Sequence, residues 1–372
     1  MSKRTVCNRC VMDNRSDDTI TFDEYGNCNY CNYSLERMKN VYFPNEHGKN
    51  KLDNMIKMLK KEGEGKKYDC MMGLSGGLDS SYLAYLIAKY NLRILAIHID
   101  DGFNTILAEE NINKLTKFCN IDLIIEKPDK EQYMDLTRAF IQAGVPNIAI
   151  PQDNILLACL YNHAKRNKIK YFLSGANFAL ESILQRGNAH NAADKTHIKA
   201  ISNEFGDKGI NKLHLTSYFE KYIANKYFKN LNILLPLNFI DYNRERAINE
   251  LNELCGFNYY GGKHYENIFT KFFQTYYLPK KFNIDKRTSH LSSLIISGQI
   301  TREDALKELE KPLYDDEEMD KDIEYILSYL EMKRKDFNKI MNEPPRKHDE
   351  YKISFLINYA HIARKYRNYL GH

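Results

Sequence analysis

The sequence lacks any long apolar segment. No stretch approaches the roughly 18 consecutive apolar residues that a membrane-spanning helix needs. The first residues, Met-Ser-Lys-Arg-Thr-Val-Cys, have no apolar core of the kind found in secretory signal peptides. Both absences argue against a membrane-embedded or secreted protein. We therefore expect a cytoplasmic protein that does not associate with membranes.

Two widespread nucleotide-binding motifs are also missing. The sequence has no Gly-x4-Gly-Lys-Ser/Thr loop, and no Gly-x-Gly-x-x-Gly opens a predicted helix. Internal repeats are absent. The net charge of +5 suits anionic substrates such as nucleotides, but it is too small to indicate nucleic-acid binding by itself.

One small-residue turn does predict a phosphate site. Residues 68–72 are apolar enough for a buried strand, and residues 81–90 have apolar side chains at helical spacing. In the turn between them, glycines allow a close approach of the backbone, serines supply hydroxyl donors, and the following helix offers free amide groups to an anion. The residues expected to hold phosphate are Ser75, Gly76, Gly77 and Ser80.

Four of the eight cysteines form two pairs near the N-terminus. Their spacing is C-x2-C-x17-C-x2-C, which is typical of a tetrahedral zinc site. Four thiolates leave no open coordination position, so we predict a structural Zn²⁺ in a small ribbon with a strand over 19–22. A redox role is less consistent, because no strand–helix–strand unit precedes the pairs. The predicted zinc ligands are Cys7, Cys10, Cys28 and Cys31.

Helical and strand patterns alternate after a charged amphipathic helix over 50–63. Strands are expected at 68–72, 93–99, 121–125 and 171–175, with helices at 81–90, 108–119 and 152–167 between them. This alternation predicts an α/β fold with a parallel sheet and helices on both faces. Ligands of such sheets lie at the carboxyl ends of strands, which here include residues 73–75, 98–101 and 174–177.

The pattern becomes mainly helical after residue 240. We expect helices over 242–255, 267–278 (stopped by Pro279), 289–297, 301–310, 318–341 and 349–370. At 372 residues the chain exceeds the usual size of one core. The predicted domains are a zinc ribbon (1–45), a linker helix (46–66), a nucleotide domain (67–240) and a helical substrate or partner region (241–372).

The turn Ser75-Gly76-Gly77-Leu78-Asp79-Ser80 resembles the pyrophosphate loop (PP-loop) of the N-type ATP pyrophosphatases, which are adenine nucleotide alpha hydrolase-like. The chain up to about residue 312 is similar to one branch of these enzymes, the N-acetyl sugar amidotransferases of bacterial surface-polysaccharide (O-antigen) and pseudaminic or legionaminic acid biosynthesis. Besides the cysteine pairs and the loop, the matching segments are residues 98–104, 152–153, 175–181, 262–279 and 285–287. Leu180 departs from the family pattern, in which a threonine often precedes the glutamate.

The resemblance implies an ATP-dependent C–N ligase that forms AMP and pyrophosphate. Adenylylation would activate the oxygen of a sugar N-acetyl amide, and ammonia would then displace AMP to leave an acetamidino group. The loop would hold pyrophosphate with Mg²⁺, and Asp79 would bind Mg²⁺ or orient the loop. Further expected nucleotide contacts are Ile97 and Ile99 (adenine), Asp100 and Asp101 (ribose or metal), and Gly175 and Asn177 at a strand end. Lys263, His264 and Lys271 would stabilise phosphate and substrate charge, and His264 could accept a proton.

Plain structural roles compete with several of these assignments. Asp100 and Asp101 could cap a turn, His264 could be an ordinary loop residue, and Lys271 could lie on a solvated helix face. His98 lies on a buried strand, where a core histidine with satisfied hydrogen bonds is the better interpretation.

The chain shows no glutaminase element: no cysteine follows Met1, and no Gly-x-Cys-x-Gly elbow is present. The resemblance therefore implies a separate glutaminase similar to that of histidine biosynthesis, sometimes with a cyclase-like subunit that passes ammonia on. The expected substrate is an N-acetylated sugar or sugar nucleotide. Two rivals remain, a zinc-containing tRNA thiolase or amidating ligase and a non-enzymatic zinc-ribbon adaptor.

Overall fold

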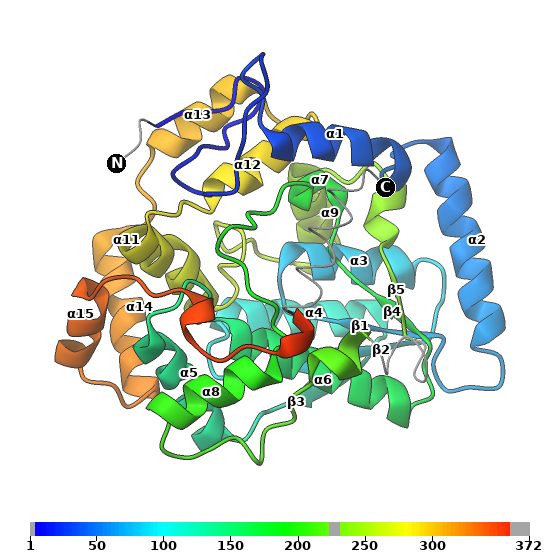
Figure 1. Ribbon diagram of the computed structural model, residues 1–372. Helices are drawn as coiled ribbons and strands as arrows, with labels where there is room; N and C mark the ends of the chain where they lie inside the picture. The colour runs from blue at the N-terminus through cyan, green and yellow to red at the C-terminus, as the bar shows by residue number, and fades with distance from the viewer. Residues whose placement is uncertain (1–3, 223–230, 358–372) are drawn as a thin grey trace.

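The computed structural model describes residues 4–222 and 231–357. Its centre is a five-stranded sheet in which every pairing is parallel, in the order β3-β2-β1-β4-β5 (Figure 1). The strands are β1 (Cys70–Gly73), β2 (Ile94–Ile99), β3 (Asp122–Glu126), β4 (Tyr171–Leu173) and β5 (Asn232–Leu234). The α/β prediction is confirmed, and the short edge strand β5 is an addition to it.

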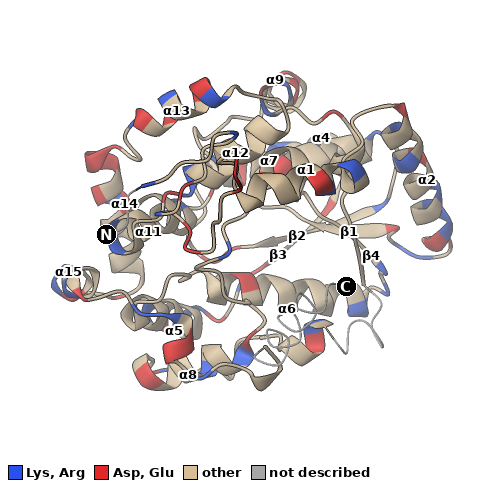
Figure 2. Ribbon diagram, turned by 45° about the horizontal axis from the view of Figure 1, so that its top comes forward, with Lys and Arg blue, Asp and Glu red and all other residues tan. Residues whose placement is uncertain are grey.

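Successive side chains of the central strands enter different cores. Met72 and Ala96 pack into a cluster with one helix layer, whereas Met71 and Leu95 pack against α6 on the opposite face. This is the alternation that a strand buried on both faces requires. Figure 2 shows α6 on one side of the sheet and α1, α4 and α7 on the other. The helices of the first layer are α1 (Asn29–Val41), α2 (Glu46–Glu62), α3 (Leu78–Ala88), α4 (Ile106–Cys119), α7 (Phe178–Glu181) and α9 (Arg244–Cys255), and α6 spans Ile150–Arg166.

A further hydrophobic cluster joins the middle of the chain to its C-terminal region. It is built from large buried side chains such as Phe140, Phe269 and Phe337. Long-range packing of this kind attaches the C-terminal helices firmly to the sheet domain. The helices concerned are α5 (Lys130–Ala143), α8 (Lys195–Phe205), α10 (Ile268–Phe272), α11 (Leu278–Phe282), α14 (Asp316–Tyr329) and α15 (Arg334–Asn342).

The strand predicted over 19–22 is wrong. Only an isolated antiparallel bridge between Phe22 and Cys28 forms there. Cys28 then caps α1, since its side chain accepts a hydrogen bond from the backbone N–H of Cys31. The second cysteine pair therefore lies at a helix N-terminus, directly after a tight turn over 23–27 that the Phe22–Cys28 bridge closes.

The expected stop at Pro279 is also wrong. The helix widens into a π-helical turn over Phe273–Tyr277 and continues as α11, with Pro279 in the first turn of α11. Proline lacks an N–H and collides with the carbonyl four residues earlier in a regular α-helix. A π turn relieves both conflicts, so the chain keeps its direction.

The helix predicted over 318–341 is two helices, α14 and α15. The break contains Glu331, whose φ of 52° lies in the left-handed region that ends helices. No glycine or proline announces this break in the sequence. The helices predicted over 289–297 and 301–310 correspond to α12 (Arg287–Ile296) and α13 (Arg302–Glu310).

The last predicted helix, over 349–370, falls largely outside the described residues. The predicted domain limits stay a prediction. Among the described helices, none combines the length and apolar character needed to cross a bilayer.

Candidate functional site

The loop between β1 and α3 is held by its own serines. The Ser75 and Ser80 hydroxyls lie 3.2 Å apart, and the Ser75 hydroxyl accepts a hydrogen bond of 3.1 Å from the Gly77 N–H. Gly77 is the N-cap of α3 and contributes no side chain to it. The first turn of α3 therefore presents amide groups that suit an anion. One of these, the Leu78 N–H, donates to the Tyr260 hydroxyl at 2.8 Å.

Gly76 has a φ of 79°, and a Cβ at this position would lie 2.6 Å from the carbonyl oxygen of Ala108. We expect Gly76→Ala to destabilise the protein by about 1–3 kcal/mol and to weaken ATP binding, because the loop must shift away from α4. Chemical denaturation and a nucleotide titration measure the two effects. Gly65→Ala is the matched control, since Gly65 also has a positive φ (72°) but a Cβ added there would have no atom within 4 Å. Equal effects of both substitutions would contradict the close-approach argument.

A charged cluster lies directly beside the loop. The Lys263 ammonium is 2.8 Å from a carboxylate oxygen of Glu181 and 3.6 Å from Oδ2 of Asp79. The other oxygen of Asp79 accepts hydrogen bonds from the Tyr242 hydroxyl at 2.7 Å and from Asn177 at 3.2 Å. Asp79 therefore fixes the position of Lys263, and Asn177 acts on the site through Asp79.

The charged cluster shifts the pKa values of its members in different directions. Burial raises the pKa of Asp79, although the Lys263 charge opposes the rise. Burial also acts on Glu181, but there the Lys263 and His264 charges prevail and lower the pKa. The two carboxylates raise the pKa of Lys263 against the effect of its burial. Lys263 therefore keeps its proton and its positive charge within the site.

His264 follows Lys263 with a φ of 65°, a left-handed conformation that costs energy for a residue with a Cβ. Its Nδ1 lies 3.7 Å from Glu266, and its ring centroid is 6.0 Å from that of His290. Asn267, three residues further along, forms an isolated bridge with Asn104, beyond the end of β2. The 263–267 segment is thus attached to the carboxyl edge of the sheet.

Asp100 and Asp101 have structural partners. Asp101 is buried and accepts hydrogen bonds from the side chains of Tyr133, Gln152 and Asn267. Burial raises its pKa, although these donors oppose the rise. Asp100 accepts a hydrogen bond from the Gly102 N–H and pairs with Lys127 at 2.7 Å. These contacts of Asp100 and Asp101 agree with the turn-capping interpretation. Asp101 also lines the cavity.

The remaining strand-end residues lie where the sheet topology requires. Ile97 and Ile99 line the cavity. His98 has partners on both ring nitrogens, the Leu74 carbonyl at 2.8 Å and Asn104 at 2.9 Å, in agreement with the core interpretation. Gly175 lies against α3, because a Cβ there would be 3.0 Å from the Ser80 nitrogen.

A cavity of about 1040 Å³ opens over these strand ends. One wall is the loop and the charged cluster, and the other is formed by the C-terminal region, including Tyr265, Gln274 and Leu294. This volume is large enough for a nucleotide together with a second substrate of similar size. The cavity brings together the predicted site residues Ser75, Gly77, Asp79, Ser80, Ile97, Ile99, Asp101, Gly175, Lys263 and His264.

Lys271 does not line this cavity. Its ammonium pairs with Glu318 at 2.5 Å and Asp322 at 2.9 Å, both on α14, and its side chain is only 10% exposed. The expected phosphate contact is therefore not formed in this structure, and neither is the alternative of a solvated face. The sequence could not reveal this, since the acidic partners lie about 50 residues away.

We expect Lys271→Met to lower the free energy of unfolding by about 1–3 kcal/mol, because Asp322 would lose its charged partner. The Michaelis constant for ATP should stay unchanged. Urea unfolding and steady-state kinetics test the two statements. A rise in the ATP constant without loss of stability would favour the original phosphate role. Lys114→Met is a control for loss of an exposed lysine.

The four N-terminal cysteines form a buried cluster whose ligand atoms all lie within 4.8 Å of one another. The sulfurs of Cys7 and Cys31 are 3.7 Å apart, and those of Cys10 and Cys28 are 3.6 Å apart. Tetrahedral Zn²⁺ with bonds of about 2.3 Å places sulfurs about 3.8 Å apart, so the thiolates fit one such ion. Backbone N–H groups also point at the sulfurs, as around other metal thiolates.

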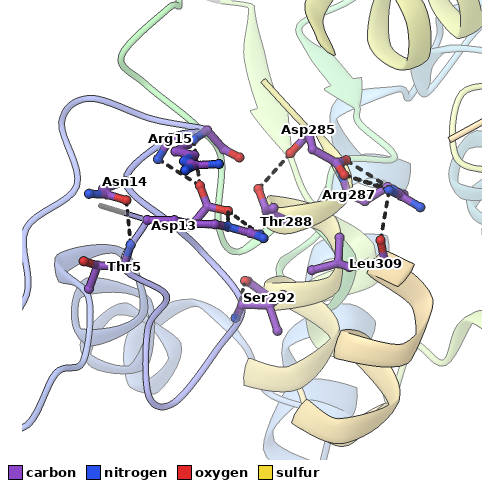
Figure 3. Close-up of polar contacts among 12 residues, drawn as sticks. Thr5, Asp13, Asn14, Arg15, Asp285, Arg287, Thr288, Ser292 and Leu309 are labelled. Carbon is purple, nitrogen blue, oxygen red and sulfur yellow. Dashed lines mark hydrogen bonds and ion pairs between the residues drawn. The ribbon is translucent and has the colours of Figure 1, made fainter. Parts of the chain in front are cut away.

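The N-terminal segment that contains Cys7, Cys10, Cys28 and Cys31, here called the cysteine lobe, is packed against the C-terminal helices. The Arg302 guanidinium on α13 donates to the carbonyls of Cys7 and Cys10, and the Ser292 hydroxyl on α12 accepts the Val11 N–H. Figure 3 shows the Asp13 turn beside Ser292, with Arg287 bonded to Asp285 and to the Leu309 carbonyl. Since Leu291 and Leu294 of α12 also line the cavity, the lobe supports one of its walls.

Several cavity residues escaped prediction from the sequence. Arg244 stacks on Tyr259, and Lys286 lies at the N-cap of α12. Tyr260, whose hydroxyl accepts the Leu78 N–H, and Tyr242, which donates to Asp79 but is not part of the cavity lining, were not predicted as site residues from the sequence. Asp153 belongs to the Gln152-Asp153 pair, so a signal existed for it. Lys286 likewise belongs to the matching 285–287 segment, whereas Arg244 comes from a helix without a motif of its own.

Comparison with known proteins gives one family match. Residues 266–364 match the family model described as "LPS biosynthesis protein WbpG-like, C-terminal domain". This agrees with the expected relation to bacterial surface-polysaccharide enzymes, and the matched segment contains Gln274 and Leu294 of the cavity wall that faces the loop. No curated protein matches the chain.

Among solved structures, three similar chains have low TM-scores. The NH3-dependent NAD synthetase from Campylobacter jejuni is 16% identical over 48% of this chain and 77% of its own, with a TM-score of 0.29. The U34-tRNA thiolase NcsA from Methanococcus maripaludis, with its [4Fe-4S] cluster, is 15% identical over 85% and 92%, with a TM-score of 0.33. The NMN synthetase from Francisella tularensis is 15% identical over 78% and 95%, with a TM-score of 0.32. At these TM-scores, the three likenesses support no conclusion about this chain.

Proposed function

We propose that this protein, whose residues 266–364 are similar to WbpG-like lipopolysaccharide biosynthesis proteins, is an ATP-dependent amidotransferase acting on a sugar N-acetyl group. The observation that carries the proposal is the shared cavity. A serine–glycine loop with an anion-binding helix N-terminus forms one wall, and the polysaccharide-related segment forms the other. An enzyme that transfers part of a nucleotide to a second substrate needs such an arrangement.

The chemistry addresses an unreactive amide. Its oxygen would attack the α-phosphorus of ATP, and pyrophosphate would leave with the electrons of the broken P–O bond. Ammonia would then attack the activated carbon, and AMP would depart with the former amide oxygen. The product is an acetamidino group.

In this proposal, side chains and backbone groups of the chain position the phosphate groups of ATP and neutralise their charge. The α3 N-terminus and the Ser75 and Ser80 hydroxyls would hold the departing pyrophosphate. Lys263 would face the phosphates, and Mg²⁺ would supply further charge neutralisation. The contacts of Asp79 with Tyr242, Asn177 and Lys263 fit the alternative in which Asp79 orients the loop better than they fit direct Mg²⁺ binding.

Ammonia would come from a separate glutaminase subunit of the histidine-biosynthesis type, with or without a cyclase-like subunit. This part of the proposal rests on the family resemblance and the missing glutaminase motifs. Full activity with millimolar glutamine but no partner protein would contradict it.

The direct experiment is acceptor-dependent pyrophosphate release from ATP. The acceptors are UDP-linked diacetamido sugars, nonulosonic acids and bulk tRNA, each with ammonium chloride as the nitrogen source. Release that depends on a sugar acceptor, with a product lighter than its acceptor by about one mass unit when O is replaced by NH, supports the proposal. Release with tRNA alone would favour the tRNA-modifying rival, and absence of ATP binding would favour the adaptor. Figure 2 shows acidic and basic segments interspersed on α2 and α13, a pattern unlike a uniformly basic nucleic-acid surface.

A further inference from the structure

One carboxylate of the cavity differs from the others in its contacts. Among the residues that the structure describes, the Asp153 side chain has neither an ion pair nor a hydrogen bond, although it is exposed to the cavity. The other carboxylates of the lining are all engaged with donors or cations. These are Asp79, Asp101, Glu181, Glu266, Asp285, Asp304 and Glu308.

Asp153 is placed at the edge of the sheet where the substrates are expected. It lies in the first turn of α6, next to Gln152, which bonds to Asp101 beyond the end of β2. Its enclosure raises the pKa of the carboxyl to about 6, while the charges of Lys221 and His264 lower it. Asp153 and His264 both line the cavity.

Some groups in the cavity lining suit anions, whereas the Asp153 carboxylate does not. The walls contain the α3 N-terminus, Lys263, Arg244 and Lys286, all of which suit phosphate groups. Asp153 would repel a phosphate and therefore suits a cationic or hydrogen-bond-donating part of the reaction. In the proposed function, that part is the incoming nitrogen.

Positive charge develops at one place in the proposed reaction. When ammonia forms the C–N bond, the new nitrogen carries three hydrogens and a positive charge. It must lose a proton to a base before AMP leaves with the C–O electron pair. The product is then an amidinium cation, whose two N–H groups point in the same direction and match the two oxygens of a carboxylate.

We propose that Asp153 binds this nitrogen: its carboxylate accepts the proton from the attacking ammonia, passes it to water, and then pairs as a carboxylate with the amidinium group of the product. His264, predicted from the sequence as a proton acceptor, lines the same cavity with its Nδ1 3.7 Å from Glu266. The inference rests on the proposed function for the identity of the cation, but the contact itself can be tested without the acceptor.

The acceptor-free test uses acetamidinium chloride as the probe. Wild-type protein should bind it at pH 8, and Asp153→Asn should bind it at least about 10-fold more weakly, since the charge-assisted pair is lost. Binding to the wild type should weaken as the pH falls from 7 to 5, because a carboxyl with a pKa of about 6 becomes protonated over this range and loses its charge. Glu308→Gln, another cavity carboxylate, should bind like the wild type. Equal binding by Asp153→Asn, or binding that does not change with pH, would overturn the inference.

The turnover test separates the two chemical steps. With a productive acceptor, exchange of labelled pyrophosphate into ATP reports adenylylation alone. Asp153→Asn should keep this exchange within about 3-fold of wild type and lower C–N bond formation by about 100-fold, the usual contribution of a positioned base. Equal loss of both steps, or of neither, would overturn the role of Asp153. If wild-type protein shows no exchange with any acceptor, the proposed function fails, whereas the acetamidinium titration still decides whether Asp153 binds a cation.

Discussion

Replacing Asp79 with Asn is expected to lower pyrophosphate release by about 100-fold or more. The amide keeps the size of the side chain but removes the charge that holds Lys263 at 3.6 Å, and Tyr242 would lose a carboxylate acceptor. Misplacing one cation that faces a departing phosphate group typically costs two to three orders of magnitude in rate. Initial rates of acceptor-dependent pyrophosphate release measure the effect.

Zinc content and the urea midpoint of Asp79→Asn should match those of the wild type, which shows that only the site has changed. Glu308→Gln serves as a second control, because it also removes a cavity carboxylate but one that pairs with Lys311 near the surface. Lys263→Met should have a similar effect to Asp79→Asn, and the double variant should be little worse than either, since the two residues act as a unit. Retained turnover in Asp79→Asn would refute the assigned role.

Loss of the zinc predicted for the cysteine cluster is expected to have the largest effect on stability. In Cys10→Ser, the bound zinc should fall from one ion per chain to none. The free energy of unfolding should fall by on the order of 5 kcal/mol, because structural zinc binding is folding free energy. Thermal unfolding and elemental analysis measure both quantities.

Turnover should fall together with zinc in this variant. Arg302 would lose ordered carbonyl partners in the lobe, and α12 forms part of the cavity wall. Cys255→Ser is the control, since Cys255 lies on α9 outside the cluster and should leave the zinc content unchanged. Iron with inorganic sulfide in the purified protein would contradict the zinc assignment, as would wild-type protein with unchanged stability after chelation.

Much of the fold could be predicted from local patterns in the sequence. The apolar segment before Gly73 and the periodic segment after Asp79 are enough to predict β1 and α3, because both elements are decided by neighbouring residues. The same holds for the paired cysteines, whose spacing alone implied that the four sulfurs meet. Local patterns gave wrong helix ends at two places. At Glu331 the helix breaks although no glycine or proline is present, and at Pro279 the helix continues although a proline is present.

The candidate site was likewise predictable from the sequence only in part. By itself, the sequence determined the serine–glycine loop, the four-cysteine cluster and the family to which the C-terminal segment is similar, since each is encoded in a short run of residues. Only the tertiary structure decided which charges meet. It placed Lys263 between Asp79 and Glu181, paired Lys271 with α14 rather than with the cavity, and put Asp153 in the cavity lining with no hydrogen bond or ion pair from its side chain to another described residue. The reason is physical: the pKa and the role of a charged side chain depend on burial and on groups within a few ångströms, and those groups come from distant parts of the chain.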